Sequence, residues 1–320
     1  MTTTVAPLVE VTGLTKRYGD TIAVDGVDLT VRPGEVYGFL GPNGAGKTTT
    51  LRILTGLIAP SAGQVRVLGG RPGQSDVLRR IGSLIEAPAF YPYLSGLDNL
   101  RLLAEYAAVP RRKIDEVLEL VDLTDRARDR FSTYSLGMKQ RLGVAGALLK
   151  DPELVILDEP TNGLDPAGMR DMRRLIRELG TGGRTVLLSS HLLGEVQQIC
   201  DRVGIISHGR MVAEHDVQEL REQQDLVIGA DPLDKAERVI ADLLGADAVH
   251  PYDGKLRVEV DPGRTAELNR RLVEADIAVS ELRTTERALE DVFFQLTQGE
   301  TTQGDTTQGE TTNEEKSDVG

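Results

Sequence analysis

A glycine-rich segment, GPNGAGKT at residues 41–48, constrains the fold of this 320-residue chain more than any other feature. It has the phosphate-loop pattern of a glycine, four further residues and then Gly-Lys-Thr. An apolar run at residues 35–40 predicts a buried strand before it, and residues 48–57 predict a helix after it. In that order, curled backbone N–H groups and the positive end of the helix dipole meet at one point. The segment therefore predicts a binding site for phosphate groups.

The residues of this loop have distinct expected roles in binding a nucleotide. Lys47 is expected to reach the β- and γ-phosphates, and the hydroxyl of Thr48 is expected to ligate Mg²⁺. The glycines let the backbone curl so that its N–H groups face the phosphate oxygens. The other expected contacts are Gly41, Pro42, Asn43, Gly44, Ala45, Gly46 and Thr49.

Two neighbouring carboxylates, Asp158 and Glu159, follow a second apolar run at residues 154–157. Adjacent residues of a strand point in opposite directions, so the two carboxylates are expected to have different roles. Asp158 suits a partner of Mg²⁺, and Glu159 suits a base that orients or polarises the attacking water. The structural alternative is an acidic turn at the end of a strand, which the phosphate loop upstream disfavours.

The patterning of the first 224 residues predicts an α/β fold. Residues 8–31 alternate apolar and polar side chains in two runs, which indicates antiparallel strands joined near residues 18–21. Residues 87–150 are predicted to be helical, with Ser95 and Asp98 as a capping box. Strands and helices then alternate, which is typical of a parallel sheet. The predicted elements are strand 154–157, helix 167–179, strand 185–188 and helix 193–199.

The composition becomes polar near residues 221–225, which predicts a boundary between domains at 1–224 and 225–296. The second part is predicted to run strand, helix, strand, strand, helix, strand, an order that suits a small ferredoxin-like α+β domain. These elements are expected at 226–230, 233–244, 246–250, 255–260, 264–274 and 277–282. A last helix is expected to bury one stripe of Leu289, Val292, Phe293 and Leu296. Residues 297–320 repeat TQGET-like pentapeptides and are predicted to be a disordered tail.

The composition argues against several classes of protein. The net charge of −13 disfavours binding to nucleic acid, which requires clustered Lys and Arg. The single cysteine, Cys200, can form neither an intrachain disulfide nor a zinc cluster, and it is expected to be a small buried side chain. The N-terminus lacks the basic start and apolar run of a signal peptide. No apolar stretch reaches the roughly 18 residues that cross a bilayer, so a cytosolic protein is expected.

Four further motifs follow a fixed order with the phosphate loop. YSLGMKQR at 134–141 resembles the signature motif of ABC ATPases, and NGLDP at 162–166 resembles their D-loop. His191 in SSHLLGEV resembles the switch histidine of that family, and Tyr18 in KRYGD resembles the aromatic residue that stacks on adenine. The resemblance covers roughly residues 7–222. It implies a RecA-like core with a helical signature subdomain and an antiparallel β subdomain.

The resemblance also implies a mechanism that needs two copies of the chain. In ABC ATPases two subunits pack head to tail, and each ATP lies between the phosphate loop of one subunit and the signature of the other. Ser135 and Gly137 are then expected to present the signature hydroxyl and amide, with Ser135 capping the helix that starts after it. ATP closes this homodimer and hydrolysis reopens it, with Lys47, Glu159 and His191 as the catalytic residues.

Two positions depart from the usual ABC pattern. Glu86 in IGSLIEAPAFYP occupies the position of the Q-loop glutamine, where its carboxylate is expected to ligate Mg²⁺ but cannot donate a hydrogen bond to water. Leu136 occupies the position of the first signature glycine, where a Cβ atom restricts the backbone. Both departures resemble exporter ATPases of the bacitracin and lantibiotic immunity type. The ending ALEDVFFQLT resembles that of drug-resistance exporters of the daunorubicin type.

These resemblances imply the ATP-hydrolysing subunit of an ABC exporter. It is expected to drive efflux of a drug, peptide or lipid-like substrate through separate transmembrane permease subunits, which hold it on the inner face of the cell membrane. Phe90, Tyr91 and Tyr93 are expected to receive the coupling helix of such a subunit. The alternative is that this loop packs on its own helical insert.

Two other functions use the same motifs. A soluble ABC protein acting on ribosomes or DNA usually has two ATPase domains, long coiled coils or a basic stripe, and this sequence shows none of these. A regulatory subunit without ATPase activity lacks catalytic side chains, whereas Lys47, Asp158, Glu159 and His191 are all present here. The exporter ATPase therefore remains the prediction.

Overall fold

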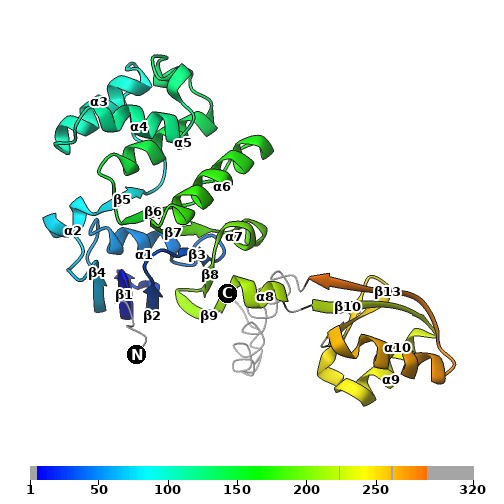
Figure 1. Cartoon of the computed structure of the whole chain (residues 1–320). Helices are drawn as coiled ribbons and strands as arrows, with labels where there is room; N and C mark the ends of the chain where they lie inside the picture. The colour runs from blue at the N-terminus through cyan, green and yellow to red at the C-terminus, as the bar shows by residue number, and fades with distance from the viewer. Residues whose placement is uncertain (1–5, 223, 261, 287–320) are drawn as a thin grey trace, which may run out of the picture.

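The computed structural model of the chain describes residues 6–222, 224–260 and 262–286. Its largest sheet has six strands in the order β5-β6-β7-β3-β8-β9 (Figure 1). The first five strands run parallel, and β9 pairs antiparallel with β8. The strands are β3 (Val36–Leu40), β5 (Ile81–Leu84), β6 (Leu154–Leu157), β7 (Thr185–Ser190), β8 (Arg202–Ser207) and β9 (Arg210–Asp216).

The inner strands of this sheet are covered on both faces. Every residue of β3, β6, β7 and β8 is buried, which is typical of a parallel sheet between two layers. Alternate residues enter different cores: Val36 and Leu40 pack in one, and Tyr37 and Phe39 pack in the other. The covering helices are α1 (Lys47–Leu54), α5 (Leu136–Leu148), α6 (Pro166–Thr181) and α7 (Leu193–Ile199). The predicted alternation of strands and helices is confirmed.

Cys200, directly after α7, is buried against β3. A Cβ atom at Gly38 would lie 2.8 Å from its sulfur, so the glycine makes room for the thiol. Burial raises the pKa of the Cys200 thiol well above its usual value and keeps it protonated. The prediction of a small buried side chain is confirmed.

A second, antiparallel sheet has the strand order β2-β1-β4. β1 (Val9–Tyr18) and β2 (Thr21–Val31) are joined at the predicted turn, where Tyr18 pairs with Thr21. The sequence does not predict β4 (Ala62–Val67), because its apolar alternation is limited to Val65 and Val67 and most of its side chains are exposed. The apolar side chains of this sheet share a core with α1.

Three helices form the part of the molecule that lies beyond β5, at the top of Figure 1. They are α3 (Gly96–Tyr106), α4 (Arg112–Leu120) and α5, and the short α2 (Ser75–Arg79) precedes β5. Ser95 Oγ accepts a hydrogen bond from Asp98 N at 3.0 Å and donates to the Asp98 carboxylate at 2.6 Å, so the capping box is confirmed. The prediction of helix over residues 87–150 is wrong at residues 87–95, where Pro88 and Pro92 interrupt the segment, and at residues 121–135, which form turns and two short 3₁₀ segments.

The C-terminal part of the described chain forms an antiparallel sheet of its own, in the order β11-β12-β10-β13. Its two helices share one apolar core with the strands. The order strand, helix, strand, strand, helix, strand is as predicted, but β11 starts late because Ala246–Ala248 forms a 3₁₀ turn. The elements are β10 (Gln224–Asp231), α9 (Leu233–Leu244), β11 (Val249–Tyr252), β12 (Lys255–Glu259), α10 (Thr265–Glu274) and β13 (Ala278–Glu286).

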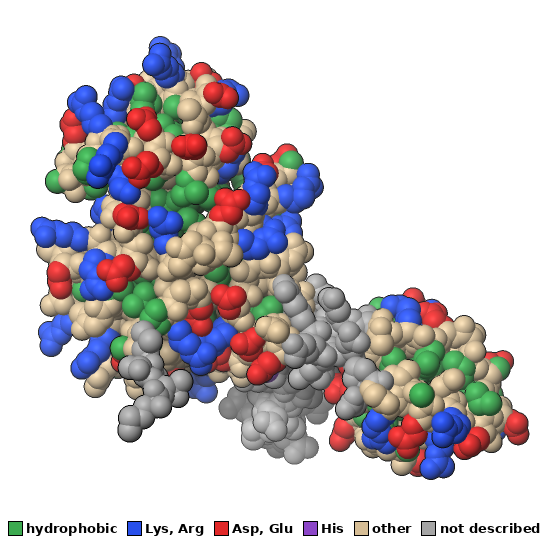
Figure 2. Space-filling model, in the orientation of Figure 1, with side chains coloured by type: hydrophobic (Ala, Val, Ile, Leu, Met, Phe, Trp, Pro, Cys, Tyr) green, Lys and Arg blue, Asp and Glu red, His purple; other side chains and the backbone are tan. Residues whose placement is uncertain are grey.

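Two predictions concern residues outside the described ranges, namely the last amphipathic helix at 289–296 and the repeat tail at 297–320. The division of the chain near residue 224, which directly follows α8 (Val217–Glu222), stays a prediction. Within the described ranges no helix is both long enough and apolar enough to cross a bilayer. Figure 2 shows acidic and basic side chains interspersed over the visible face.

Candidate nucleotide-binding site

The glycine-rich loop connects the carboxyl end of β3 to the first turn of α1. Gly44 and Gly46 have φ angles of 82° and 105°, which L side chains rarely adopt. A Cβ atom at Gly46 would lie 2.5 Å from the Ala23 carbonyl oxygen, and one at Gly41 would lie 2.3 Å from that of Ile206. These glycines are therefore required by the backbone path that curls the loop around the start of α1.

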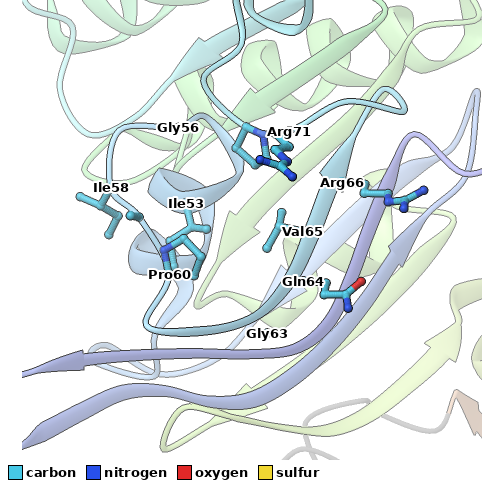
Figure 3. Close-up of a pocket in the computed structure, with 11 residues that line it drawn as sticks. Ile53, Gly56, Ile58, Pro60, Gly63, Gln64, Val65, Arg66 and Arg71 are labelled. Carbon is cyan, nitrogen blue, oxygen red and sulfur yellow. The ribbon is translucent and has the colours of Figure 1, made fainter.

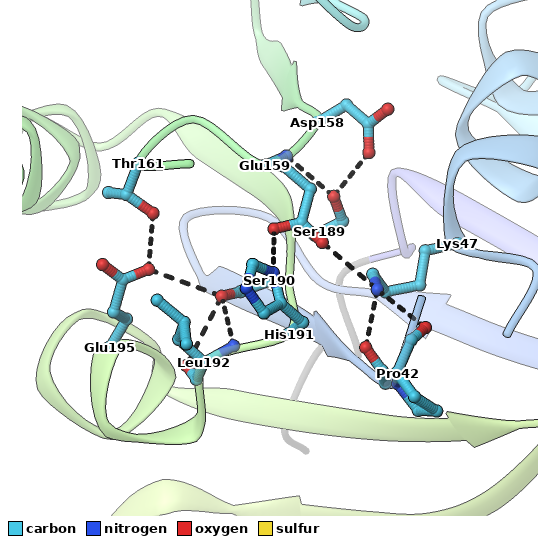
Figure 4. A network of polar contacts seen from close by, with 11 residues as sticks. Pro42, Lys47, Asp158, Glu159, Thr161, Ser189, Ser190, His191, Leu192 and Glu195 are labelled. Atoms are coloured by element: carbon cyan, nitrogen blue, oxygen red, sulfur yellow. Dashed lines mark hydrogen bonds and ion pairs between the residues drawn. The ribbon is translucent and has the colours of Figure 1, made fainter. Parts of the chain in front are cut away.

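Lys47 is the first residue of α1, and its side chain folds back over the loop. Its Nζ atom donates hydrogen bonds to the carbonyl oxygens of Gly41 (2.6 Å) and Pro42 (3.1 Å). The same atom forms an ion pair with Glu159 Oε1 at 3.2 Å (Figure 4). The ammonium group thus lies at the mouth of the loop and beside the end of β6.

Asp158 and Glu159 follow β6, and their side chains take different directions. Asp158 is buried, and its Oδ1 accepts a hydrogen bond from Ser189 Oγ at 2.6 Å. Glu159 has a φ angle of 47°, and its backbone N–H donates to the same serine oxygen at 2.9 Å. Ser189 therefore fixes both residues, and their carboxylates point apart (Figure 4), whereas the different roles expected of them stay a prediction.

The Glu159 carboxylate, after β6, contacts one residue of α1 and one residue that follows β7. Its Oε1 pairs with Lys47, and its Oε2 lies 2.7 Å from Nδ1 of His191, directly after β7. The exposed fractions of the three side chains are 5% for Lys47, 18% for Glu159 and 31% for His191. The predicted catalytic residues are thus brought into direct contact at the carboxyl ends of β3, β6 and β7, where open α/β sheets bind their ligands.

The donors available for a divalent cation are oxygen atoms. Thr48 is half-buried in the first turn of α1, and Asp158 lies at the end of β6. A hydroxyl and a carboxylate suit Mg²⁺, which in nucleotide sites uses one or two side chains together with phosphate oxygens and water. The described residues contain no group of three or more His, Cys, Asp and Glu side chains that could hold a metal by itself. The residues present therefore fit a Mg²⁺ ion that arrives with a nucleotide.

Glu86 lies apart from this network. It follows β5, has a φ angle of 64° and is 60% exposed. Within the described chain its carboxylate forms an ion pair with Arg52 on α1, and not with Lys47. The sequence does not reveal this pairing, because Arg52 and Glu86 meet only through the fold.

The signature residues lie at the start of α5. Ser135 is the N-cap residue of this helix, and its Oγ accepts a hydrogen bond from Met138 N at 3.3 Å, as predicted. Leu136 is 47% exposed, and its Cδ2 would lie 3.2 Å from a Cβ atom at Gly163. The start of α5 thus packs beside the loop at 162–166, and the two predicted motifs form one surface.

Tyr18 ends β1 with an exposed ring. The Lys16 ammonium lies 5.0 Å from the centre of this ring, which is a cation–π distance. The ring is therefore accessible for stacking, as the prediction of an adenine contact requires.

Sequence reasoning misses four polar residues near the site: Thr161, Ser189, Ser190 and Glu195. Ser189 and Ser190 end β7, which lies beside β6 in the parallel sheet. Parallel strands place their carboxyl ends at one edge, so the serine pair before His191 is a signal that could have indicated contact with Asp158.

A separate cavity of about 530 Å³ lies beside α1 and β4 (Figure 3). Its wall is apolar at Ile53, Ile58 and Val65, with Arg66 and Arg71 at its rim. None of Lys47, Asp158, Glu159 or His191 lines it. The cavity is therefore not part of the site built around the phosphate loop.

Comparisons with known proteins agree with this geometry. Residues 24–162 match the ABC transporter family. The chain is 42% identical over 302 residues to the bacitracin transport ATP-binding protein BcrA of Bacillus licheniformis, covering 92% of this chain and 98% of that protein. It is 38% identical over 313 residues to the daunorubicin resistance ATP-binding protein DrrA3 of Streptomyces coeruleorubidus, covering 90% and 95%. A solved dimeric bacterial ABC transporter cassette is similar with a TM-score of 0.60 and 25% identity, covering 65% of this chain and 98% of that one.

Proposed function

The chain belongs to the family of ABC transporter ATP-binding proteins, whose members hydrolyse ATP, and we propose that two copies of it form the ATPase pair of an exporter. The observation that carries this proposal is the position of the Glu159 carboxylate between Lys47 and His191 at the end of β6. A carboxylate beside the γ-phosphate site, held in place by a histidine, suits the orientation of an attacking water.

The ion pair of Lys47 with Glu159 implies that ATP binding comes before the activation of Glu159 as a base. The phosphate oxygens of ATP compete with Glu159 for the Lys47 ammonium. Once Lys47 binds phosphate, Glu159 keeps its hydrogen bond to His191 and has its other oxygen free to accept a proton from water. ATP binding therefore prepares the base that hydrolysis needs.

Mg²⁺ is the second component of the proposed site. Thr48 and Asp158 would hold it, and it would neutralise charge on the phosphates. Glu86 has the position of a further metal contact by motif, and its carboxylate would have to leave Arg52 to fill that role.

Each chain supplies only half of each proposed ATP site. The half with the phosphate loop takes the triphosphate, with Tyr18 on the adenine. Ser135 and Gly137 of the second copy complete it, because a hydroxyl and a helix N-terminus bind phosphate well. Leu136 at the start of α5 is 47% exposed and is therefore accessible to that second copy.

We place the contact with a membrane subunit on the helical part of the molecule. Tyr91 and Tyr93 are 52% and 66% exposed, whereas Phe90 packs edge-on against Phe131 with ring centres 5.3 Å apart. A hollow of about 660 Å³ between α2 and α3 is lined by Leu78, Leu103 and Tyr106 and adds exposed apolar surface. Docking of transmembrane permease subunits here would hold the chain at the inner face of the cell membrane.

The proposed cargo is a drug, peptide or lipid-like compound. The relatives named for bacitracin transport and daunorubicin resistance align along most of the chain, so the chemistry of their cargoes is the best guide. We further propose that residues 225–296 form a separate domain with a role in dimer contacts or regulation.

The variant Glu159→Gln tests the proposed role of Glu159. It keeps the size of the side chain and an oxygen that can accept from His191, but it removes the base. We expect ATP binding to persist while turnover falls by at least about 100-fold, as for loss of a general base. ATPase rate and bound nucleotide are measured on the same sample. Glu119→Gln, an exposed change on α4, is the control, and rapid turnover by Glu159→Gln would remove the assignment.

A further inference from the structure

Glu195 is a buried carboxylate close to the site, and the roles described above do not use it. It lies in α7, four residues after His191, and only 5% of the residue is exposed (Figure 4). A buried carboxylate is unfavourable unless it is paired or hydrogen-bonded. Its partners therefore indicate why the chain places it there.

The partners of Glu195 come from the two turns that carry Glu159 and His191. Thr161, two residues after Glu159, donates its hydroxyl to Glu195 Oε2. The hydroxyl of Ser190, directly before His191, lies 3.4 Å from the same oxygen and 3.4 Å from the Leu192 carbonyl oxygen, so its one proton is shared between these two acceptors. One carboxylate oxygen thus ties the turn after β6 to the turn after β7.

Ser190 also forms hydrogen bonds with the residue that follows His191 and with the start of the phosphate loop. Its Oγ accepts a hydrogen bond from Leu192 N at 3.0 Å, so it fixes the backbone that follows the histidine. Its carbonyl oxygen accepts from Gly41 N at 3.2 Å, at the start of the phosphate loop. The position of His191 therefore depends on a chain of hydrogen bonds that ends at Glu195.

The charge of Glu195 has no cationic partner in the described part of the chain. No Lys, Arg or His there forms an ion pair with it, and its Oε1 is buried without a hydrogen-bond partner in that same part. A half-satisfied buried carboxylate is a poor way to gain stability. Its arrangement fits a geometric role better than a stabilising one.

We propose that Glu195 is a positioning residue for ATP hydrolysis. By accepting from Thr161 and Ser190 it holds the two turns in the relative position at which Glu159 and His191 meet at 2.7 Å. It contacts neither Lys47 nor the loop glycines directly, and its own hydrogen bonds go to the turns that carry Glu159 and His191, so we expect it to act mainly on the hydrolysis step and little on nucleotide affinity. This inference depends on the proposed roles of Glu159 and His191.

Two variants of Glu195 in the full-length protein separate geometry from mere packing. Glu195→Gln keeps an oxygen that accepts from Thr161 and Ser190, whereas Glu195→Met fills the space without one. We expect Glu195→Met to lower kcat by about 10- to 100-fold, the effect of losing a hydrogen bond to a charged group, with KM for ATP nearly unchanged. Glu195→Gln is expected to restore most of kcat. An unchanged kcat in Glu195→Met, or equal losses in both variants, would overturn the proposal.

Variants of Thr161 provide the same test from the other end of the hydrogen bond. Thr161→Val keeps the shape and removes the hydroxyl, whereas Thr161→Ser keeps the hydroxyl. We expect Thr161→Val to lower kcat as much as Glu195→Met does, and Thr161→Ser to retain the wild-type kcat. The double variant Thr161→Val/Glu195→Met should have a kcat no lower than that of either single variant. Additive losses would contradict a shared role, and this pair remains informative if Glu195→Met does not fold.

The Glu159→Gln variant distinguishes this inference from the proposed function. If Glu159→Gln binds ATP without turnover and Glu195→Met is fully active, only the inference on Glu195 fails. If Glu159→Gln turns over ATP rapidly, the proposed function fails first, and the roles assigned to Glu195 and Thr161 fail with it.

Discussion

The two ends of the central sheet carry buried charges that are arranged in different ways. At the carboxyl ends of β3, β6 and β7, Lys47, Glu159 and His191 form a partly exposed network. At the amino ends of β3 and β8, Arg202 pairs with Glu35 at 3.0 Å and with Glu214 at 2.8 Å. The side chains of Arg202 and Glu35 are only 9% and 10% exposed.

The second network has a closed set of partners. Glu35 also accepts a hydrogen bond from Arg32 N at 2.6 Å, and the Tyr37 hydroxyl donates to Glu214 at 2.6 Å. No incoming ligand is needed to satisfy these charges. In the proposed function the carboxyl-end network differs, because Lys47 would exchange Glu159 for a phosphate and Glu159 would exchange Lys47 for a water. The comparison therefore contrasts a closed network at the amino ends of the sheet with a network at the carboxyl ends that we propose exchanges its partners.

The largest effect is expected from Lys47→Ala. The variant removes the cation that binds phosphate, so we expect ATP binding or turnover to be lost by at least about 100-fold. ATPase rate and fluorescent-nucleotide binding measure it, with Lys235→Ala, an exposed change on α9, as the control. An unchanged ATPase rate would remove the phosphate-loop role and the comparison with it.

Arg202→Met tests the closed network. It leaves Glu35 and Glu214 without their cation, so we expect the free energy of unfolding to fall by about 3–5 kcal/mol. The activity per folded molecule should stay close to that of the wild type. Urea titration measures the change. Arg210→Met, which breaks an exposed pair with Asp25, is the control and should cost less than about 1 kcal/mol. Equal effects of the two variants would show that the amino-end network has no special role.

The smallest effect concerns pH. Burial, followed by the hydrogen bond to Glu214, raises the pKa of Tyr37 well above its usual value. This pKa is higher in the folded chain than in the unfolded one. The contribution of the protonated Tyr37 to the free energy of unfolding is therefore complete below about pH 10, and it is lost as the pH rises through the pKa of Tyr37 in the folded chain. Tyr37→Phe should cost about 1 kcal/mol at pH 7 and show a shallower loss of stability above pH 10. Identical slopes for wild type and variant would contradict this cause.

Much of the site is predictable because its residues belong to contiguous patterns. The phosphate loop, the Asp158–Glu159 pair and the Ser135 cap each combine a local sequence signal with a local structure. The contacts of Thr161, Ser190 and Glu195 are not predictable in this way, since they arise only when the ends of β6 and β7 meet.

The fold shows the same limit. The apolar runs of β3 and β6 and the alternation of β1 are predicted well, whereas β8 and β9 are missed, although β8 is buried along its whole length. β5 has only four residues, and β4 has mostly exposed side chains, so neither carries a sufficient pattern. The pairing of Glu86 with Arg52 is likewise a product of tertiary structure, although the position of Glu86 in the sequence predicted a metal contact.

The composite ATP site is the central claim, and light scattering of Glu159→Gln with and without ATP tests it most directly. We predict that Glu159→Gln forms dimers with ATP and is monomeric without it. The double variant Glu159→Gln/Ser135→Arg should still bind ATP but stay monomeric, because the second copy then cannot complete the site. A double variant that still dimerises with ATP, or a Glu159→Gln protein that binds ATP and stays monomeric, would contradict the account.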